Sequence, residues 1–324
     1  MSRGTATLRR VLPMVGRRLA LVVPLLAIVT LVAFSLVFLI PGDPAEKVAG
    51  EGATVAQVEA VRVDLGLDRP VWEQFGSFLL GLAQGDLGTS YTFKTPVLDM
   101  ILARMPVTVS LTVVALAIAL LIGIPAGVLA GRRAGRWEDR AVTVGSTIGL
   151  ATPNYVLGLL LAMFFGVQLG WLPAAGYTPL AEGWWAWLSH LLLPGLALGL
   201  VAAAEIARQL RASLASVLQQ DYVRTALAKG MSSRTIVWKH ALKNALMPVV
   251  TVFGIQVGYL LGGTAVIETV FGIQGLGDFA VRAVLAGDLP AIQGMVVVTV
   301  GVTVLASLAV DLTYGYLNPR GEMQ

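Results

Sequence analysis

Residues 106–131 read P-V-T-V-S-L-T-V-V-A-L-A-I-A-L-L-I-G-I-P-A-G-V-L-A-G, a run of 26 residues without a charge. A helix needs about 20 apolar residues to cross the hydrocarbon core of a bilayer, so this run predicts a membrane-spanning helix. Five other uncharged runs are as long as a span or longer: Leu19–Ile40, Ala141–Ala181, Gly183–Ala204, Asn244–Ile267 and Leu289–Val310. The sequence therefore predicts an all-α integral membrane protein.

The run Ala141–Ala181 is too long for one helix, and Pro173, Gly176 and Pro179 interrupt its second part. We interpret it as one span that ends near Leu169, followed by an external loop. Aromatic residues follow the span, and such residues favour the headgroup level of a bilayer. The prediction is thus six transmembrane helices, with residues 19–40 as the first and residues 106–315 holding the other five.

The composition excludes several classes of protein. Of the 324 residues, 56% are hydrophobic and 13% are charged, and the mean hydropathy is +0.78. Soluble domains carry about 25% charged residues, so an ordinary cytosolic enzyme, a disordered tail and a coiled coil are excluded. The absence of cysteine excludes disulfides, thiolate metal sites and cysteine nucleophiles. His190 and His240 are far apart in the sequence, so we predict structural roles for both and no metal site.

Lys and Arg residues predict the orientation. With six spans, 17 of them fall on the side that holds both termini and six on the other side. The positive-inside rule then places both termini, residues 1–18 and 316–324, in the cytoplasm. The first span, 22 residues long, is predicted to be a retained anchor rather than a cleaved signal peptide. The basic residues lie between apolar runs rather than in one patch, which argues against nucleic-acid binding.

Residues 41–105 form the longest predicted external segment. Thr54–Leu65 and Pro70–Leu82 both place apolar residues at helical spacing. We expect two short amphipathic helices here, lying along the outer interface of the membrane or against the helix bundle.

The predicted cytoplasmic loop at about 211–243 contains the signals of a helix–turn–helix. Asp221 is the expected N-cap, Tyr222–Lys229 the first helix and Gly230 its left-handed stop, after which Ser232 or Ser233 caps a second helix. One interpretation is a basic loop that binds anionic lipid headgroups. The other is a docking surface for a cytoplasmic partner, since small side chains allow close approach. Its residues would be Asp221, Tyr222, Arg224, Thr225, Ala226, Ala228, Lys229, Gly230, Ser232 and Ser233.

Here the sequence resembles a known family. D-Y-V-R-T-A-L-A-K-G at 221–230, followed by H-A-L-K-N-A-L-M-P at 240–248, is similar to the cytoplasmic loop of ABC importer permeases of the dipeptide, oligopeptide and nickel branch. Two elements of the general pattern of such permeases, a leading acid and a closing proline, are absent, as is typical of the peptide branch. Other stretches also resemble this family, in order along the chain: P-G-D-P (41–44), G-D-L-G-T-S (85–90), A-T-P-N-Y (151–155) and E-T-V-F-G-I-Q-G-L-G (268–277).

The resemblance implies a type I importer permease fold in a bacterial plasma (inner) membrane. It implies that the chain is the first of two homologous permease subunits, which together enclose a pathway for dipeptides or oligopeptides. The implied partners are the second permease, two ATP-binding subunits that bind ATP and Mg, and an external substrate-binding protein. Nickel, haem or another small solute is the alternative cargo.

Candidate pathway or gate residues are Pro153, Asn154, Glu205, Glu268, Gly275 and Gly277. A Pro-Asn pair inside a span predicts a kink that lines a cavity. For Glu205 we favour an ion pair with Arg208, one helical turn away, over a gate. Glu268 and the glycines after it predict either a gate or a purely structural turn.

The chain is not predicted to be an enzyme. A phosphate-binding loop needs a Gly-Lys pair, and none of the five lysines follows a glycine. The energy for transport must then come from partner subunits. Two rival interpretations remain: an ion-coupled carrier that uses Glu205, Glu268 and Asp311 as a proton relay, and an inert membrane scaffold.

Overall fold

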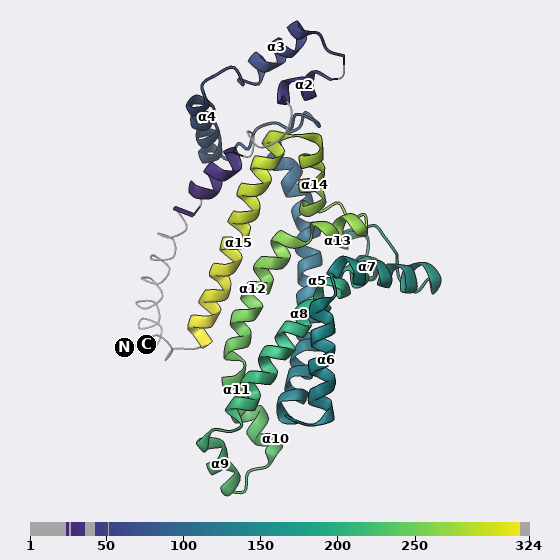
Figure 1. Ribbon diagram of the computed structural model, residues 1–324, viewed down its shortest axis with the longest axis vertical. Coiled ribbons are helices and arrows are strands. Elements are labelled where there is room, and N and C mark those ends of the chain that lie inside the picture. Colours follow the sequence, from purple (N-terminus) through teal and green to yellow (C-terminus); the bar gives the residue numbers. More distant parts are fainter. Residues whose placement is uncertain (1–23, 26, 36–42, 51, 318–324) are drawn as a thin grey trace. The chain divides into compact units, whose positions relative to one another are not determined.

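Figure 1 shows the computed structural model of the chain, which describes residues 24–25, 27–35, 43–50 and 52–317. In this part of the chain all regular secondary structure is helical, apart from one isolated bridge between Thr89 and Pro96. The predicted all-α class is therefore confirmed. The predicted first span, residues 19–40, lies partly outside the described residues, although 27–35 are helical. The predicted cytoplasmic residues 1–18 and 318–324 lie outside them as well.

The chain divides into two compact units. We call residues 109–273 and 303–317 the α6–α13 unit, and the described residues between 24 and 108 together with residues 274–302 the α2–α4 unit. Two long helices, α5 (Val97–Arg132) and α15 (Leu289–Leu317), contribute residues to both units.

The α6–α13 unit is built around α8 (Trp184–Val217). Its residues Ile206, Leu210 and Leu214 recur every four positions, so they lie on one face of the helix, and none is exposed. The helices that contact α8 include α6 (Trp137–Ala151), α7 (Asn154–Leu161), α11 (Leu242–Ala245) and α12 (Met247–Gly263). The shorter elements are η2 (Ala162–Gln168), η3 (Leu180–Glu182), α9 (Asp221–Ala228), α10 (Ser233–Thr235), η4 (Ile236–Ala241) and α13 (Ala265–Val270).

Glycines let α5 approach α8 closely. Gly123, Gly127 and Gly131 recur every four residues, and each faces α8. A Cβ added at Gly127 would lie 2.8 Å from Leu210 Cβ and 2.9 Å from the carbonyl oxygen of Ala207. Helices in membranes pack through such small residues because lipid supplies no hydrophobic drive for their association.

Among the described residues, three helices are long and apolar enough to cross a membrane: α5, α8 and Leu289–Val310 of α15. Two bent pairs would supply one span each. Trp137–Ala151 and Asn154–Gln168 meet at 99°, and Ser233–Ala245 and Met247–Gly263 meet at 51°. The first break follows from Thr152, which is extended, and from Pro153, which is the N-cap of α7. The second lies beside Pro248, in the first turn of α12.

The α2–α4 unit contains α2 (Pro44–Ala49), α3 (Val55–Asp64), α4 (Val71–Gln84) and α14 (Leu276–Ala286). Helices were predicted at the positions of α3 and α4. Thr54 begins α3 with a capping box, in which its side chain accepts from Gln57 N and the Gln57 side chain accepts from Thr54 N. The span predicted from Pro106 belongs to a helix that begins earlier, at Val97.

A buried carboxylate organises the loop before α5. Asp288, 1% exposed, accepts from Ser90 Oγ, from Tyr91 N at 3.1 Å and from Thr92 N at 3.2 Å. Three donors satisfy this charge, which would otherwise be costly to bury. The network fixes residues 90–92 of the α2–α4 unit against the start of α15.

Candidate functional site

The loop after α8 folds into the predicted helix–turn–helix. Helix α9 covers Asp221–Ala228, and Gln220 rather than Asp221 is its N-cap. The prediction for Asp221 was wrong by one position, a shift that a pattern of residue types does not resolve. Asp221 lies instead in the first turn, where a carboxylate still interacts favourably with the helix dipole.

Gly230 stops α9, as the sequence predicts. Its φ is +79°, in the left-handed region that costs a residue with a Cβ roughly 1 kcal/mol. The N–H of Met231 donates to Ala226 O at 3.2 Å, which closes the helix end. Of the two predicted capping serines, Ser232 is the cap, because its hydroxyl accepts from Thr235 N at 3.3 Å.

The underside of the loop is anchored on α8. Val223 of α9 is 2% exposed, and Val237 and Ala241 of η4 join a core cluster with Leu210 and Leu214. A side-chain hydrogen bond adds to this packing, since Asn244 Nδ2 donates to Tyr222 Oη at 3.1 Å. The helix pair is therefore held in place rather than hanging from α8.

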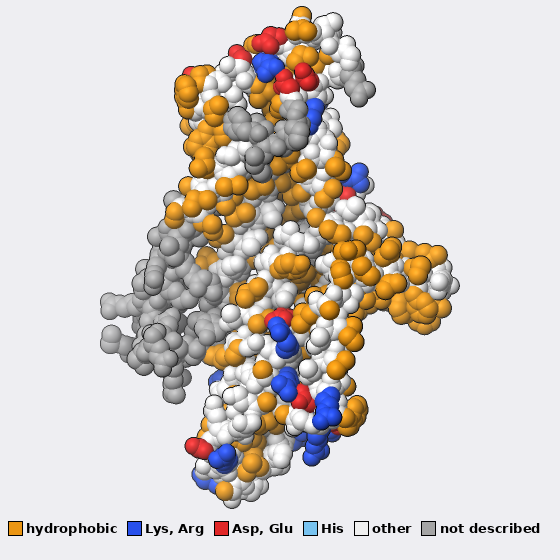
Figure 2. Space-filling model, viewed as in Figure 1, with side chains coloured by type: hydrophobic (Ala, Val, Ile, Leu, Met, Phe, Trp, Pro, Cys, Tyr) orange, Lys and Arg blue, Asp and Glu red, His pale blue; other side chains and the backbone are white. Residues whose placement is uncertain are grey.

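The outer side of the loop is open. The side chain at Ala226 is half-buried, and the other nine predicted docking residues are exposed. A Cβ added at Gly230 would meet nothing within 4 Å. Two apolar side chains add to this surface, Leu227 at 50% and Trp238 at 55% exposure. In Figure 1, α9 and α10 lie beyond the end of α8, and Figure 2 shows Lys and Arg gathered towards that end of the α6–α13 unit. We call the ten residues together with Leu227 and Trp238 the α9–α10 surface.

A buried ion pair fixes α8 just before this loop. Arg211 donates to Asp139 of α6 through Nε and Nη2, both at 2.8 Å. Asp139 is 3% exposed and also accepts from Gly135 N at 2.8 Å. The planar guanidinium matches the carboxylate with two parallel hydrogen bonds. Residue spacing gave no sign of this pair, because 72 positions separate its members.

Glu205 forms the ion pair favoured by the sequence. Arg208 Nη2 donates to both of its carboxylate oxygens at 2.7 Å. The pair is on α8, one turn apart, and the Arg208 side chain is 63% exposed. An exposed pair of this kind contributes little to stability.

A groove of about 370 Å³ lies between α5, α6 and α8. Its wall includes Gly145 and Gly149 of α6 and Thr152, the C-cap of that helix, and it ends beside the break at Pro153. Beyond the break, α7 turns onto α13, so that a Cβ at Gly158 would lie 3.1 Å from Ile267 Cδ1. Figure 1 shows α7 crossing the line of α6 rather than extending it. The break therefore creates both the end of the groove and the α7–α13 contact.

Glu268 is fully buried in α13. Thr264 Oγ1 donates to the Glu268 carboxylate at 2.8 Å, and the backbone oxygen of Glu268 accepts from Ile273 N at 2.8 Å. The same turn receives a bond from Gly176 N to Phe271 O at 2.7 Å. The structure thus brings Glu268 and the Pro153–Asn154 break onto contacting helices, whereas Glu205 lies elsewhere on α8.

Gly275 and Gly277 lie in the α2–α4 unit. Gly275 is the N-cap of α14 and accepts from Phe279 N at 3.2 Å, and Gly277 lies in the first turn. Thr108 Oγ1 accepts from Leu276 N at 2.8 Å, which satisfies one of the free donors at this helix start.

His190 makes a local contact within α8. His190 Nδ1 is 2.8 Å from Ala186 O, within its own helix. Within the described ranges, no cluster of three His, Asp or Glu side chains could hold a metal ion. The α5 glycines were missed by the sequence analysis, although their spacing of four carries the small-residue signal of helix packing.

Comparison with known families gives two matches that together cover most of the chain. Residues 123–322 match the binding-protein-dependent transport system inner membrane component, and residues 11–112 match the amino-terminal membrane component of such systems.

Several curated proteins are similar over nearly the whole chain. The glutathione transport system permease protein GsiC of Pectobacterium atrosepticum is 44% identical over 303 residues, covering 94% of this chain and 96% of that protein. A putative peptide transport system permease protein of Brucella abortus is 40% identical, covering 94% and 97%. The dipeptide transport system permease protein DppB of Alkalihalophilus pseudofirmus is 38% identical with the same coverage.

Among solved structures, inward-facing conformations of the MetNI methionine ABC transporter contain a similar chain. Its TM-score is 0.56 at 22% identity, with 67% of this chain and 96% of that chain covered. The likeness supports an ABC importer permease fold.

Proposed function

The chain belongs to the binding-protein-dependent transport system inner membrane components and is thus a multi-pass permease subunit of an ATP-driven importer; on that premise we propose that it carries short peptides. It is a transport subunit rather than an enzyme, and ATP hydrolysis belongs to separate subunits. The names of its relatives, which include glutathione, dipeptide and peptide permeases, support a peptide cargo. Nickel, haem or another small solute remains the alternative.

We propose that this subunit pairs with a second, homologous permease. Two ATP-binding subunits would dock from the cytoplasm, and an external binding protein would deliver the peptide. The α9–α10 surface carries the docking part of this proposal. The outer side of this surface is exposed, and its underside packs against Leu210 and Leu214 of α8, which holds it firmly on that helix. A partner that pushes on this surface would move α8 as a body.

The proposed topology has six spans with both termini in the cytoplasm. Three straight helices and two bent pairs support five of these spans, and helical residues 27–35 support part of the first. Residues 41–105 would then be external, and residues 106–315 would form the core with its cytoplasmic loop. The distribution of Lys and Arg supports this orientation.

The proposed pathway uses the groove between α5, α6 and α8. Its apolar wall and the break at the exposed Pro153 support a cavity that opens when the subunits rock. Pro153 and Asn154 would form its kink, whereas Glu205 is engaged in its ion pair with Arg208. We also propose Glu268 as a gate residue of the α6–α13 unit, and Gly275 and Gly277 as gate residues of the α2–α4 unit.

One pair of variants tests the docking assignment. Gly230→Arg places a long side chain on the α9–α10 surface, and we expect the six spans to insert normally while the ATPase subunits no longer co-purify and uptake is lost. Gly135→Arg is the matched control, since Gly135 also has a left-handed φ, +82°, and open space around it. We expect this control to retain both the ATPases and uptake.

The outcome separates docking from lipid anchoring. If the loop only bound headgroups, either arginine would strengthen membrane attraction by about 1 kcal/mol, and both variants would keep their ATPases. Full retention of the ATPases and of uptake in Gly230→Arg would therefore overturn the docking assignment.

A further inference from the structure

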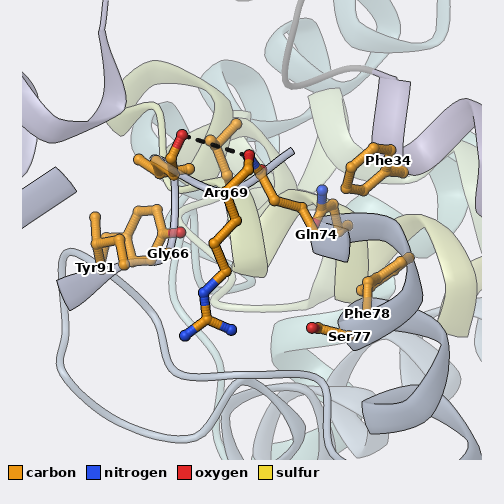
Figure 3. A pocket seen from close by; sticks show the side chains of 11 residues that line it. Phe34, Gly66, Arg69, Gln74, Ser77, Phe78 and Tyr91 are labelled. Carbon is orange, nitrogen blue, oxygen red and sulfur yellow. Dashed lines mark hydrogen bonds between the residues drawn. The ribbon is translucent and has the colours of Figure 1, made fainter. Parts of the chain in front are cut away.

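A small pocket of about 160 Å³ lies within the α2–α4 unit. The turn between α3 and α4, one side of α4 and the first turns of α15 form its wall. Figure 3 shows its side chains. Its lining residues are Phe34, Leu65, Gly66, Leu67, Arg69, Gln74, Ser77, Phe78, Tyr91, Leu289 and Gln293. We call it the Arg69 pocket.

The turn that carries Arg69 is fixed by hydrogen bonds. Gly66 has a φ of +66°, and Leu67 N donates to Arg62 O at 3.0 Å. From α4, Gln74 Nε2 donates to Arg69 O at 2.8 Å and to Leu67 O at 3.4 Å. A Cβ on Gly66 would lie 3.5 Å from Arg69 Nε, so the arginine side chain passes over this glycine. These contacts hold the turn that forms one wall of the pocket.

Arg69 makes no ion pair within 4.0 Å in the part of the chain that the structure describes. Its neighbour Arg62, by contrast, pairs with Asp43 and Glu59. No carboxylate is among the described residues that line the pocket. The acidic side chain nearby, Asp288, already accepts from three donors of residues 90–92.

The other polar groups suit an anion as well. Ser77 and Tyr91 contribute hydroxyls, and Gln293 contributes an amide. Burial, with the nearby charge of Asp288, raises the pKa of Tyr91 to about 12, so its phenol remains a donor at neutral pH. In Figure 3 the Arg69 guanidinium extends between Tyr91 and Ser77. Figure 3 places Phe34 and Phe78 together on one side of the pocket, and their ring centroids are 6.3 Å apart.

We propose that the Arg69 pocket binds the carboxyl-terminal residue of a short apolar peptide. The guanidinium would hold the carboxylate with two parallel hydrogen bonds, and the last side chain would pack on Phe34 and Phe78. Sites for whole drug-sized ligands measure about 300–1,000 Å³, so this pocket suits one residue and is too small for a diacyl lipid. The peptide cargo rests on the proposed function.

Equilibrium binding of trileucine and of trileucine amide tests the proposal. The full chain would be reconstituted in nanodiscs of neutral lipid, without ATPases. We expect the amide to bind about 10- to 100-fold more weakly, because a hydrogen bond to a charged group contributes roughly 1.5–3 kcal/mol. Arg69→Gln should abolish the difference between the two peptides, and Arg69→Lys should restore only part of it. Lys94→Gln removes an exposed charge that does not line the pocket and should change neither affinity.

Two outcomes would overturn the proposal: equal binding of acid and amide, or no binding of either. A third outcome would also overturn the proposal. If phosphatidylglycerol in the nanodiscs abolished trileucine binding to the wild type but not to Arg69→Gln, the pocket would be assigned to an anionic lipid. The proposed function is tested separately by ATP-driven uptake in the assembled complex. If the complex imports peptide but peptide binding does not depend on Arg69, only the assignment of the pocket is rejected. If trileucine binds but the complex imports no peptide, only the proposed peptide cargo is rejected.

Discussion

The close contact between α5 and α8 predicts that adding one methyl group at Gly127 destabilises the chain. In Gly127→Ala the new Cβ would lie 2.8 Å from Leu210 Cβ and 2.9 Å from Ala207 O. One of these atoms belongs to the backbone, so relief requires the helices to separate. Overpacking of this kind costs roughly 1–3 kcal/mol, and the greater helix propensity of alanine returns up to about 1 kcal/mol. We expect a net loss of about 1–2 kcal/mol.

Gly145→Ala is the matched control. Gly145 is also inside a helix, α6, but its added Cβ would meet nothing within 4 Å. Only the propensity term then applies, so this variant should be more stable than the wild type by about 0.4–1 kcal/mol. The two variants make the same chemical change, and their stabilities should move in opposite directions.

Denaturant unfolding of the purified chain in detergent measures both changes, with the seven tryptophans as the fluorescent probe. The isolated chain is the right sample, because Gly145 lies on the groove wall and its variant could also affect assembly. Stability of Gly127→Ala equal to or above that of Gly145→Ala would refute the close packing of α5 on α8.

Four further predictions concern topology, energy coupling, charge and pH. A cysteine at Thr92 should react with an impermeant thiol reagent from outside and one at Ser216 only from inside; labelling of Ser216→Cys from outside would reverse the orientation. Uptake by the assembled complex should follow ATP, and an uncoupler that stops uptake at constant ATP would favour an ion-coupled carrier. Asp139→Asn should destabilise the chain by roughly 2 kcal/mol. This is less than the roughly 3–5 kcal/mol lost when a fully buried pair is broken, because Arg211 is partly exposed. Adding Arg211→Met should recover part of the lost stability, and fully additive effects of the two substitutions would contradict the ion pair. Tyr91 has a folded-state pKa above its ordinary value of 10.0, so the stability of the folded chain should fall as the pH rises from 10 to about 12. Tyr91→Phe should reduce that fall. An unchanged dependence of stability on pH in this variant would argue against the burial of the phenol.

The sequence by itself determined the class of protein and the local form of its loops. Uncharged runs with enough residues to span the hydrocarbon core of a bilayer predict membrane helices, since lipid cannot solvate charge. The turn at Gly230 and the cap at Ser232 were predictable because both depend on a few neighbouring residues and their backbone angles. The helices near Thr54 and Pro70 were predictable for the same reason. Asp221 shows the limit of this approach, as its cap was misplaced by one position.

Only the tertiary structure decided how these helices bend and what they touch. Pro153 signals a break, but the 99° angle depends on the packing of α7 against α13 and α8. Arg211 finds Asp139 across 72 positions, and Asp288 binds residues 90–92 across nearly 200. No local rule links such residues. Their pairing follows from which helix faces meet, because a buried charge is stable only where folding brings its partner.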